Sequence, residues 1–315
     1  MARMTISSNY EGTAAVPFVA PAILSADTIA NGYCSVLDNV RFKTNLRKVS
    51  GGTVEGRSCD FSGLANGTLA ISDVQLEMTE LQVNEEICNH ELATSWASEQ
   101  MRGAFAPVPG DYEQFLAQYV ASRVAEDIEK NIWSGKYDHT DGSTSGTGVP
   151  VLFDSIMSRY VAGAGTHETL VDLAFTGDNN GNTGIATHLA SLVADLPDAL
   201  VGDPATVIYM SRKTFQLYFQ FLASNDNNPV LATQMAKFYL GYEIICPAGF
   251  PDDTLLASRK DNLYFGTNVL TDHVEARFID LRNTTGADLT RILMMFDGGT
   301  QIVDEASMAC VRRNS

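Results

Sequence analysis

The sequence predicts an α+β fold in which a long helix and a compact α/β region lie between two regions of β-strands. Residues 36–83 alternate apolar and polar side chains, a pattern typical of strands. Residues 111–135 carry apolar side chains at about every fourth position, which is typical of an amphipathic helix. Strand patterns return between residues 273 and 313. A chain of 315 residues can bury a core around these elements without disulfides or a metal ion.

Composition excludes several classes of protein. Hydrophobic residues make up 45% of the chain and charged residues 19%, which excludes wholesale disorder, collagen and coiled coil. The formal net charge of −17 argues against a protein whose main function is to grip nucleic acid, because that function needs a basic surface. No apolar run approaches the ~18 residues of a membrane span. The apolar stretch 14–26 is interrupted by Pro17 and Pro21, so we do not expect a secretion signal.

The N-terminal part is expected to form an extended arm followed by a β projection. Residues 1–35 have no sustained helical or strand period, which predicts an arm with one short helix near 23–30. Between residues 36 and 83, strand patterns flank Gly51 and Gly52, which predicts one long hairpin or two. Strands of ~15 residues would reach ~50 Å, and such an element is costly in a monomer unless a partner covers it.

Charge is segregated in this projection. Five of the six charged residues in 41–57 are basic, whereas 58–101 contain no Lys or Arg. One interpretation is a solvated basic loop beside a solvated acidic surface. The other is a basic projection that docks on an acidic surface of another copy. The candidate inter-subunit residues are then Arg41, Lys43, Arg47 and Lys48 on the projection, and the candidate acidic receivers are Glu77, Glu80, Glu85, Glu86, Asp111, Glu113, Glu126, Asp127 and Glu129.

The best-defined element is a helix from Asp111 to a stop at Gly135, here called the spine helix. A helix over 89–101 and a break at 107–110 are expected before it. At 1.5 Å per residue the spine helix would be ~35 Å long. Its apolar stripe consists of Leu116, Val120, Val124, Ile128 and Ile132, widened by Phe115, Tyr119 and Trp133.

The remaining chain is predicted as loops, an α/β insert and a β tail. Residues 135–184 are rich in turn formers and are expected to be loops with one strand pair. The α/β insert is expected to have its own core, with helices over 185–200, 213–223 and 229–240 and strands over 206–211, 242–248 and 261–268. In the tail, turns are expected at 283–286 and 298–299, and a last strand ends at Val311.

No catalytic, cofactor or metal site emerges from the motifs. The histidines are far apart, and there is no HExxH, GxSxG, GxxxxGK[ST] or strand-linked GxGxxG pattern. A calcium-like spacing at 178–184 has Leu189 where the bidentate carboxylate belongs, and the acids around His139 are typical of a turn. We therefore predict no enzyme. The single cysteines predict reduced thiols: Cys34, Cys59, Cys88, Cys246 and Cys310.

The order of arm, basic β projection, spine helix, α/β insert and β tail resembles the major capsid protein of tailed bacteriophages, the Hong Kong 97-type fold. The resemblance spans nearly the whole chain, and it includes the local patterns NIWSGK, PATVIYMSRKTFQLY and GYEIICPAGFPDDTLLA. It implies an N-terminal arm over 1–35, an E-loop over 36–72, a P-domain over 73–180 with 269–315, and an A-domain over 181–268.

The resemblance also implies a function. Copies of the chain would form pentamers and hexamers of an icosahedral head that encloses double-stranded DNA, assembled in the host cytoplasm and located in the virion. Further partners would be separate scaffolding, portal and decoration proteins. DNA would be contacted weakly and without sequence specificity, and no membrane or cofactor is implied. Some relatives join subunits through a Lys–Asn bond. Lys43 and Lys48 lie in the right region, but no matching Asn and catalytic Glu are identified, so this chemistry is not carried over.

Two alternatives stay open. The first is an encapsulin-like cellular shell of the same fold, which would enclose enzymes instead of a genome. The second is a soluble α/β hydrolase with a site in the loops of residues 138–184.

Overall fold

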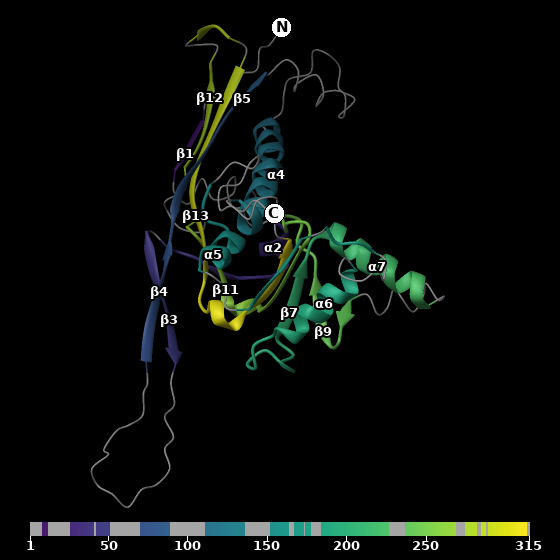
Figure 1. The fold of residues 1–315 in the computed structure, drawn as a ribbon. Coiled ribbons are helices and arrows are strands. Elements are labelled where there is room, and N and C mark those ends of the chain that lie inside the picture. The colour runs from purple at the N-terminus through teal and green to yellow at the C-terminus, as the bar shows by residue number, and fades with distance from the viewer. Residues whose placement is uncertain are drawn as a thin grey trace, which may run out of the picture.

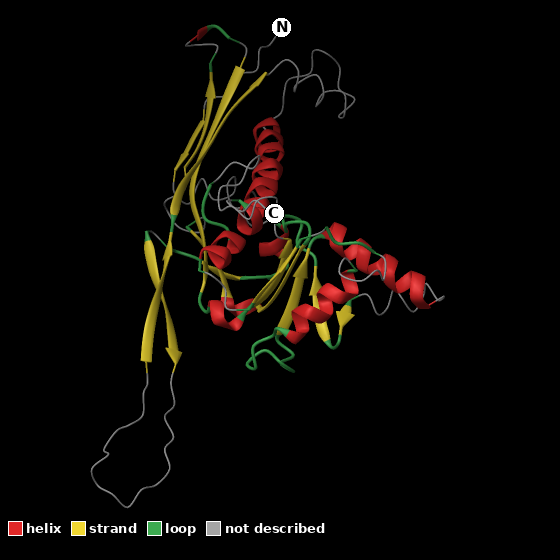
Figure 2. Cartoon of the chain, viewed as in Figure 1, coloured by secondary structure: helices red, strands yellow, loops and turns green. Residues whose placement is uncertain are grey.

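The computed structural model describes residues 8–11, 26–40, 42–50, 70–88, 111–135, 152–163, 167–172, 174–177, 184–226, 237–268, 275–281, 285–287 and 289–313. Its elements form two six-stranded sheets, helices that pack against them, and a separate two-stranded hairpin. The hairpin projects away from the body (Figures 1 and 2). The predicted α+β class is confirmed.

The first sheet is built around the long strand β13 (Leu289–Ile302). β12 (Glu275–Asp280) and β5 (Thr79–Cys88) lie on either side of its first part, and β11 (Leu263–Thr267) pairs with its last part. β1 (Ser8–Glu11) extends the sheet beyond β12, and β2 (Ser35–Leu37) extends it beyond β11. Every second side chain in the first part of β13 is buried, which is the period expected of a strand with one covered face.

The turn predicted at 298–299 is wrong, because β13 runs through both glycines as a continuous strand. Gly299 pairs with Gly266 of β11, and a Cβ atom on Gly299 would lie 2.3 Å from the carbonyl oxygen of Glu77. Gly299 therefore allows a close approach of two backbones, which is another common reason for glycine inside a strand.

The second sheet has the order β6 (Glu168–Val171), β14 (Ala309–Arg313), β10 (Thr254–Arg259), β7 (Thr206–Met210), β9 (Tyr242–Ile245) and β8 (Phe238–Tyr239). One face packs on α6 (Ile185–Ala194) and α7 (Arg212–Asp226), with Ile208 and Leu255 in that core. The other face, with Tyr209 and Leu256, belongs to the core around the spine helix. The central strands are thus buried on both sides.

The spine helix is α4 (Asp111–Ser134), and it ends where the sequence predicted. Val120, Val124, Ile128 and Ile132 are buried together with Trp133, which confirms this part of the predicted stripe. Tyr119 is 47% exposed, so the expected widening of the stripe at that position is wrong. The side chains of Phe115 and Leu116 lie outside the described residues.

Several elements differ from the prediction. A helix, α5 (Ile156–Ala162), lies within the region expected to be loops; the side chain of Ser155 caps it by accepting a hydrogen bond from the Ser158 amide at 3.1 Å. β10 was not predicted as a strand, because both its faces are covered and its side chains show no alternation. The helix expected over 229–240 is wrong at its end, where β8 forms. The helix expected over 89–101 lies outside the described residues.

The second sheet extends beyond the predicted insert of residues 181–268. Its strands β6 and β14 come from either side of that range, whereas β11, inside the range, belongs to the first sheet. The core on the α6 and α7 side accordingly includes Ala309 and Val311 of β14. The α/β region is therefore joined to the rest of the body through shared strands.

Candidate functional site

The projecting hairpin consists of β3 (Lys43–Ser50) and β4 (Ala70–Glu77). The two strands pair only with each other within the described residues, in an antiparallel register that sets Lys43 opposite Glu77 and Arg47 opposite Asp73. The predicted hairpin in this part of the chain is confirmed, and the tip around Gly51 and Gly52 lies outside the described residues.

One face of the hairpin is fastened to the body. Leu76 is completely buried, and Leu46 and Val74 on the same face are half-buried. A Cβ atom on Gly266 would lie 2.8 Å from the Leu76 side chain, so this glycine makes room for it. At the edge of β4, the side-chain amide of Gln301 donates a hydrogen bond to the carbonyl oxygen of Gln75 at 2.9 Å. The base of the hairpin is therefore anchored by close packing.

The opposite face, here called the outer face, carries charged and apolar pairs. Lys43 forms an ion pair with Glu77, and its hydrogen bond lowers the pKa of that carboxyl group. Arg47 lies 3.7 Å from Asp73, and its side chain is 77% exposed. Further along, Val49 and Ile71 stand opposite each other, 61% and 64% exposed. Two exposed aliphatic side chains side by side on a narrow ribbon are unusual for an isolated subunit.

The third basic residue of β3 contacts the body. Lys48 forms an ion pair with Asp304, at the start of the short helix η4 (Glu305–Ser307). Burial by itself raises the pKa of Asp304, but hydrogen bonds from Lys48 and Ser307 outweigh it and lower the pKa below its ordinary value. The ionised carboxylate also accepts a hydrogen bond from the amide of Ala306 at 3.1 Å. This contact is here called the hairpin latch.

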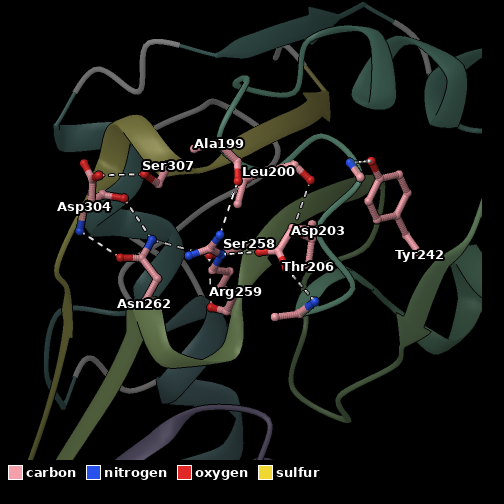
Figure 3. A network of polar contacts seen from close by, with 12 residues as sticks. Ala199, Leu200, Asp203, Thr206, Tyr242, Ser258, Arg259, Asn262, Asp304 and Ser307 are labelled. Atoms are coloured by element: carbon pink, nitrogen blue, oxygen red, sulfur yellow. Dashed lines mark hydrogen bonds and ion pairs between the residues drawn. The ribbon is translucent and has the colours of Figure 1, made fainter.

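A polar network continues from Asp304 into the α/β region (Figure 3). The amide of Asp304 donates to Asn262 Oδ1 at 2.8 Å, and Asn262 donates back to the Asp304 carbonyl oxygen at 2.8 Å. Arg259 lies close to Asn262 in the chain. Its guanidinium forms an ion pair with Asp203 and donates a hydrogen bond to the carbonyl oxygen of Ala199 at 3.3 Å. The Gly202 amide of the same loop donates to the Tyr242 hydroxyl at 3.0 Å. The latch is thus continuous with the loop of residues 199–206.

The predicted cations of the projection lie together, but each has an acid of its own chain beside it. Lys43, Arg47 and Lys48 contact Glu77, Asp73 and Asp304, respectively, and Arg41 lies outside the described residues. The charge segregation seen in the sequence therefore reflects, in part, a basic strand paired with an acidic one. A contact between these residues and another copy stays a prediction.

The predicted acidic receivers are dispersed. Glu80, Glu85 and Glu86 lie on β5, where Glu86 forms an ion pair with Arg291. Glu126 and Asp127 are exposed on the spine helix, and Glu126 lies 3.4 Å from Arg123. Asp111 and Glu113 belong to the same helix, with side chains outside the described residues.

Glu129 is only 3% exposed, so it is not available on the surface as the predicted acidic receiver. Its carboxylate accepts hydrogen bonds from the amide and the hydroxyl of Thr28, at 2.9 and 2.6 Å, and the Trp133 indole donates to the same hydroxyl at 2.6 Å. Burial outweighs these hydrogen bonds and raises the pKa of Glu129. Glu129 is buried because Thr28 belongs to the short helix α2 (Asp27–Ala30), which covers this part of the spine helix.

A groove that sequence reasoning missed lies beside the base of the hairpin. It has a volume of about 460 Å³, and its described lining consists of Phe42, Glu80, Leu81, Gln82, Met295, Phe296 and Asp297. Phe42 is 76% exposed and Met295 42% exposed. Only the pairing of β5 with β13 brings these distant segments together, so no local pattern in the sequence indicates the groove.

The described residues offer little for catalysis. Among them, no three His, Cys, Asp or Glu side chains are grouped so that they could hold a metal ion. The described cysteines are free thiols, and burial raises the pKa of Cys34 to about 12. In this same part of the chain, no helix is long and apolar enough to cross a membrane.

Comparison with solved structures identifies the fold. A chain of the satellite phage P4 procapsid that includes the size determination (Sid) protein is similar with a TM-score of 0.65 and 13% identity, over 100% of this chain and 94% of that chain. A chain from the capsid of an empty GTA particle is similar with a TM-score of 0.58 and 14% identity, over 92% of this chain and 90% of that chain. A chain of Mycobacterium phage Che8 is similar with a TM-score of 0.52 and 12% identity, over 99% of this chain and 93% of that chain. By sequence, no protein-family model and no curated protein matches.

The protein therefore has the fold of phage capsid proteins, as the resemblance in the sequence predicted. The likeness covers almost the whole of each compared chain. At these low sequence identities, what the chains share is the fold.

Proposed function

We propose that the protein is the major capsid protein of a tailed bacteriophage, with the Hong Kong 97-type fold, which assembles with copies of itself into a closed icosahedral shell. The single observation that carries the proposal is the likeness to phage procapsid and capsid chains over the full length of the chain. The projecting hairpin adds a physical reason. Its outer face leaves Val49 and Ile71 uncovered, and a neighbouring subunit in a shell would cover them.

In this proposal the regions of the chain take the roles that the family resemblance implies. Residues 1–35 are the N-terminal arm, and 36–72 are the E-loop that crosses onto a neighbour. Residues 73–180 with 269–315 are the P-domain, built on the spine helix and the first sheet. Residues 181–268 are the A-domain, which converges on the axes of pentamers and hexamers. The second sheet includes β6 and β14 from outside residues 181–268, which supports an A-domain that is held rigidly on the P-domain.

The packaged partner in this proposal is double-stranded DNA. A net charge of −17 suits a shell that encloses DNA without binding it tightly, because a strongly basic inner wall would neutralise many phosphates. Separate scaffolding, portal and decoration proteins complete the expected set of partners. The subunit itself has no enzymatic role, and its site of action is the virion, after assembly in the host cytoplasm.

Negative-stain electron microscopy of the purified protein, together with light scattering, tests the proposal. We expect closed shells of uniform size, alone or with a co-expressed scaffolding protein. A species that stays monomeric across salt, pH and concentration, with and without a scaffold, would contradict it. Turnover of an ester or amide substrate by that monomer would instead favour a hydrolase. Shells from infected or producing cells should contain nuclease-protected DNA; enclosed enzymes would favour the encapsulin-like alternative.

A further inference from the structure

We propose that residues 26–34, here called the strap, fasten the spine helix to the α/β region through the buried carboxyl group of Glu129 and open as a unit when the pH rises. The strap contains α2, and Figure 1 shows α2 where the end of the spine helix meets the second sheet. Such a strap would act in the isolated subunit, with or without assembly.

A buried polar network fastens the strap to the spine helix. Both oxygens of the Glu129 carboxyl group are bonded, one to the amide of Thr28 at 2.9 Å and the other to its hydroxyl at 2.6 Å. The amide of Gly249 donates to the same carboxyl group. A Cβ atom on Gly249 would lie 2.2 Å from the carbonyl oxygen of Glu129, so this loop passes close to the spine helix. Opening the strap would therefore remove two of the three hydrogen bonds to the carboxyl group.

Two further contacts tie the strap to the α/β region. Arg212 of α7 lies 3.2 Å from Asp27, the first residue of α2. The Tyr209 hydroxyl of β7 donates a hydrogen bond to the carbonyl oxygen of Tyr33 at 2.7 Å. Since the strap bonds to the spine helix on one side and to α7 and β7 on the other, it restrains how these elements lie relative to one another.

The strap contributes little to the hydrophobic core. Its buried side chains are small, namely Ala26, Thr28 and Cys34. Ile29 and Tyr33 pack against the core but are only partly buried. A segment that buries few large side chains can detach at a low free energy while the core stays folded. The opening would end at β2, which follows the strap and pairs with β11.

The protonation of Glu129 decides how firmly the strap is closed. Burial and the like charge of Asp27 raise the pKa of Glu129 and outweigh the hydrogen bonds, which lower it. A pocket of about 390 Å³ borders both carboxyl groups, so lifting the strap would expose Glu129 to water and return its pKa to the ordinary value of 4.5. The closed strap therefore binds the proton more tightly than the open one. This stabilisation is complete below 4.5 and is lost as the pH rises through the closed-state pKa.

The other titratable or charged side chains around Glu129 come from the strap, the spine helix and α7; they are Asp27, Tyr33, Cys34, Glu126, Lys130 and Arg212. The two cations keep their charge across this range of pH. Burial raises the pKa of Tyr33 and Cys34, that of Cys34 to about 12, so both stay neutral. Glu126 is exposed, and it therefore provides the control for Glu129.

Hydrogen exchange of the full chain, followed by mass spectrometry, tests whether the strap opens by itself. The amides of residues 28–33 donate hydrogen bonds to Glu129 or within the strap, and a four-residue helix does not keep such bonds once it is detached. We expect their exchange to depend much less on urea than that of the β7 amides, which requires global unfolding. Equal protection and equal urea dependence of the two sets would overturn the proposal.

The pH dependence without urea tests the role of Glu129. After correction for the intrinsic exchange rate, the protection of the strap amides should fall as the pH rises above 4.5, by up to about tenfold per pH unit, and then level off. Glu129→Gln leaves no ionisable group at this position and should remove the fall, whereas Glu126→Gln should keep it. A flat profile in the wild type, or the same fall in Glu129→Gln, would overturn the proposal.

Thr28→Val provides a second test if circular dichroism shows that Glu129→Gln does not fold. It removes the hydroxyl that joins Glu129 to the Trp133 indole but leaves the backbone hydrogen bond in place. The strap amides should then exchange several-fold faster at every pH in the absence of urea. Unchanged protection of these amides would show that the carboxyl group of Glu129 does not close the strap.

Discussion

The spine helix and the projecting hairpin are held to the body by different kinds of contact. Trp133 at the end of the spine helix is completely buried, with its ring centroid 5.0 Å from Tyr209 and 5.2 Å from Phe250. Beyond its base, the hairpin contacts the body through the ion pair of Lys48 with Asp304, whose side chains are 32% and 24% exposed. Truncating a buried aromatic residue costs about 3–5 kcal/mol, whereas an exposed ion pair contributes about 0.2–1 kcal/mol.

In the proposed shell, the body and the hairpin would therefore respond differently to a neighbouring subunit. The body can stay folded while the outer part of the hairpin adjusts its direction at a small cost in free energy. The hairpin base, where Leu76 and Glu77 contact Gly266 and Gly299, is the fixed point about which such an adjustment would occur. Substitutions in the body and in the hairpin should therefore differ in their effect on stability.

Trp133→Ala should destabilise the body most. It removes ring contacts with Tyr209 and Phe250 and leaves the Thr28 hydroxyl without its indole donor, so we expect a loss of about 3–5 kcal/mol in the free energy of unfolding. Urea unfolding followed by circular dichroism measures it. Tyr119→Ala on the same helix is the control, and it should change the value by less than about 0.5 kcal/mol because Tyr119 is exposed. Equal losses for both would contradict the assigned core.

Gly299→Ala should displace the hairpin base. The new methyl group would meet a backbone carbonyl at 2.3 Å, which cannot move aside as a side chain can, so we expect a cost of about 1–3 kcal/mol and faster proteolysis within residues 43–77. Gly298→Ala is the matched control. Its Cβ atom would meet only side-chain atoms, at 3.3 Å or more, and its effect should be clearly smaller. Unchanged proteolysis of Gly299→Ala would show that the hairpin base is not fixed there.

Glu129→Gln should change how stability depends on pH. Burial raises the pKa of Glu129 above the ordinary value of 4.5, so the folded state holds its proton to higher pH than the unfolded chain does. This contribution to stability is complete below 4.5 and is lost as the pH rises through the folded-state pKa. We expect the free energy of unfolding of the wild type, relative to Glu129→Gln, to fall across that window. Glu126→Gln, on the exposed face of the helix, is the control; the same change there would contradict the assignment.

Lys48→Met should have only a small effect on the isolated subunit. It removes the hairpin latch but keeps most of the apolar stem, and the partly exposed pair should contribute at most about 1 kcal/mol. Hydrogen exchange of the β3 and β4 amides should nevertheless become faster. Raising the salt concentration should reproduce part of the effect in the wild type, because salt screens the pair. Lys43→Met, which breaks the more exposed pair of the outer face, should loosen the hairpin less.

Much of the fold could be predicted where one local period decides the structure. The spine helix follows from apolar residues at every fourth position, and its end follows from Gly135, a residue that commonly terminates helices. The hairpin likewise follows from strand patterns on both sides of Gly51 and Gly52 in the sequence. Prediction failed where long-range packing decides the local structure. β10 shows no alternation because both its faces are covered. A turn was predicted at Gly298 and Gly299 because the approach of β4 to β13 is not visible in the local sequence.

In the candidate site, too, some features follow from the local sequence and others depend on long-range packing. Strand period and charge are local properties, so they suffice to predict that Lys43, Arg47 and Lys48 lie on one projection and that acids follow them along the chain. Which acids these cations meet depends on long-range contacts, since strand register places Glu77 and Asp73 on the outer face and the fold of the body brings Asp304 to Lys48. The burial of Glu129 under α2 and the groove between β5 and β13 depend on segments far apart in the chain, whose pairing is set by the free energy of the whole core.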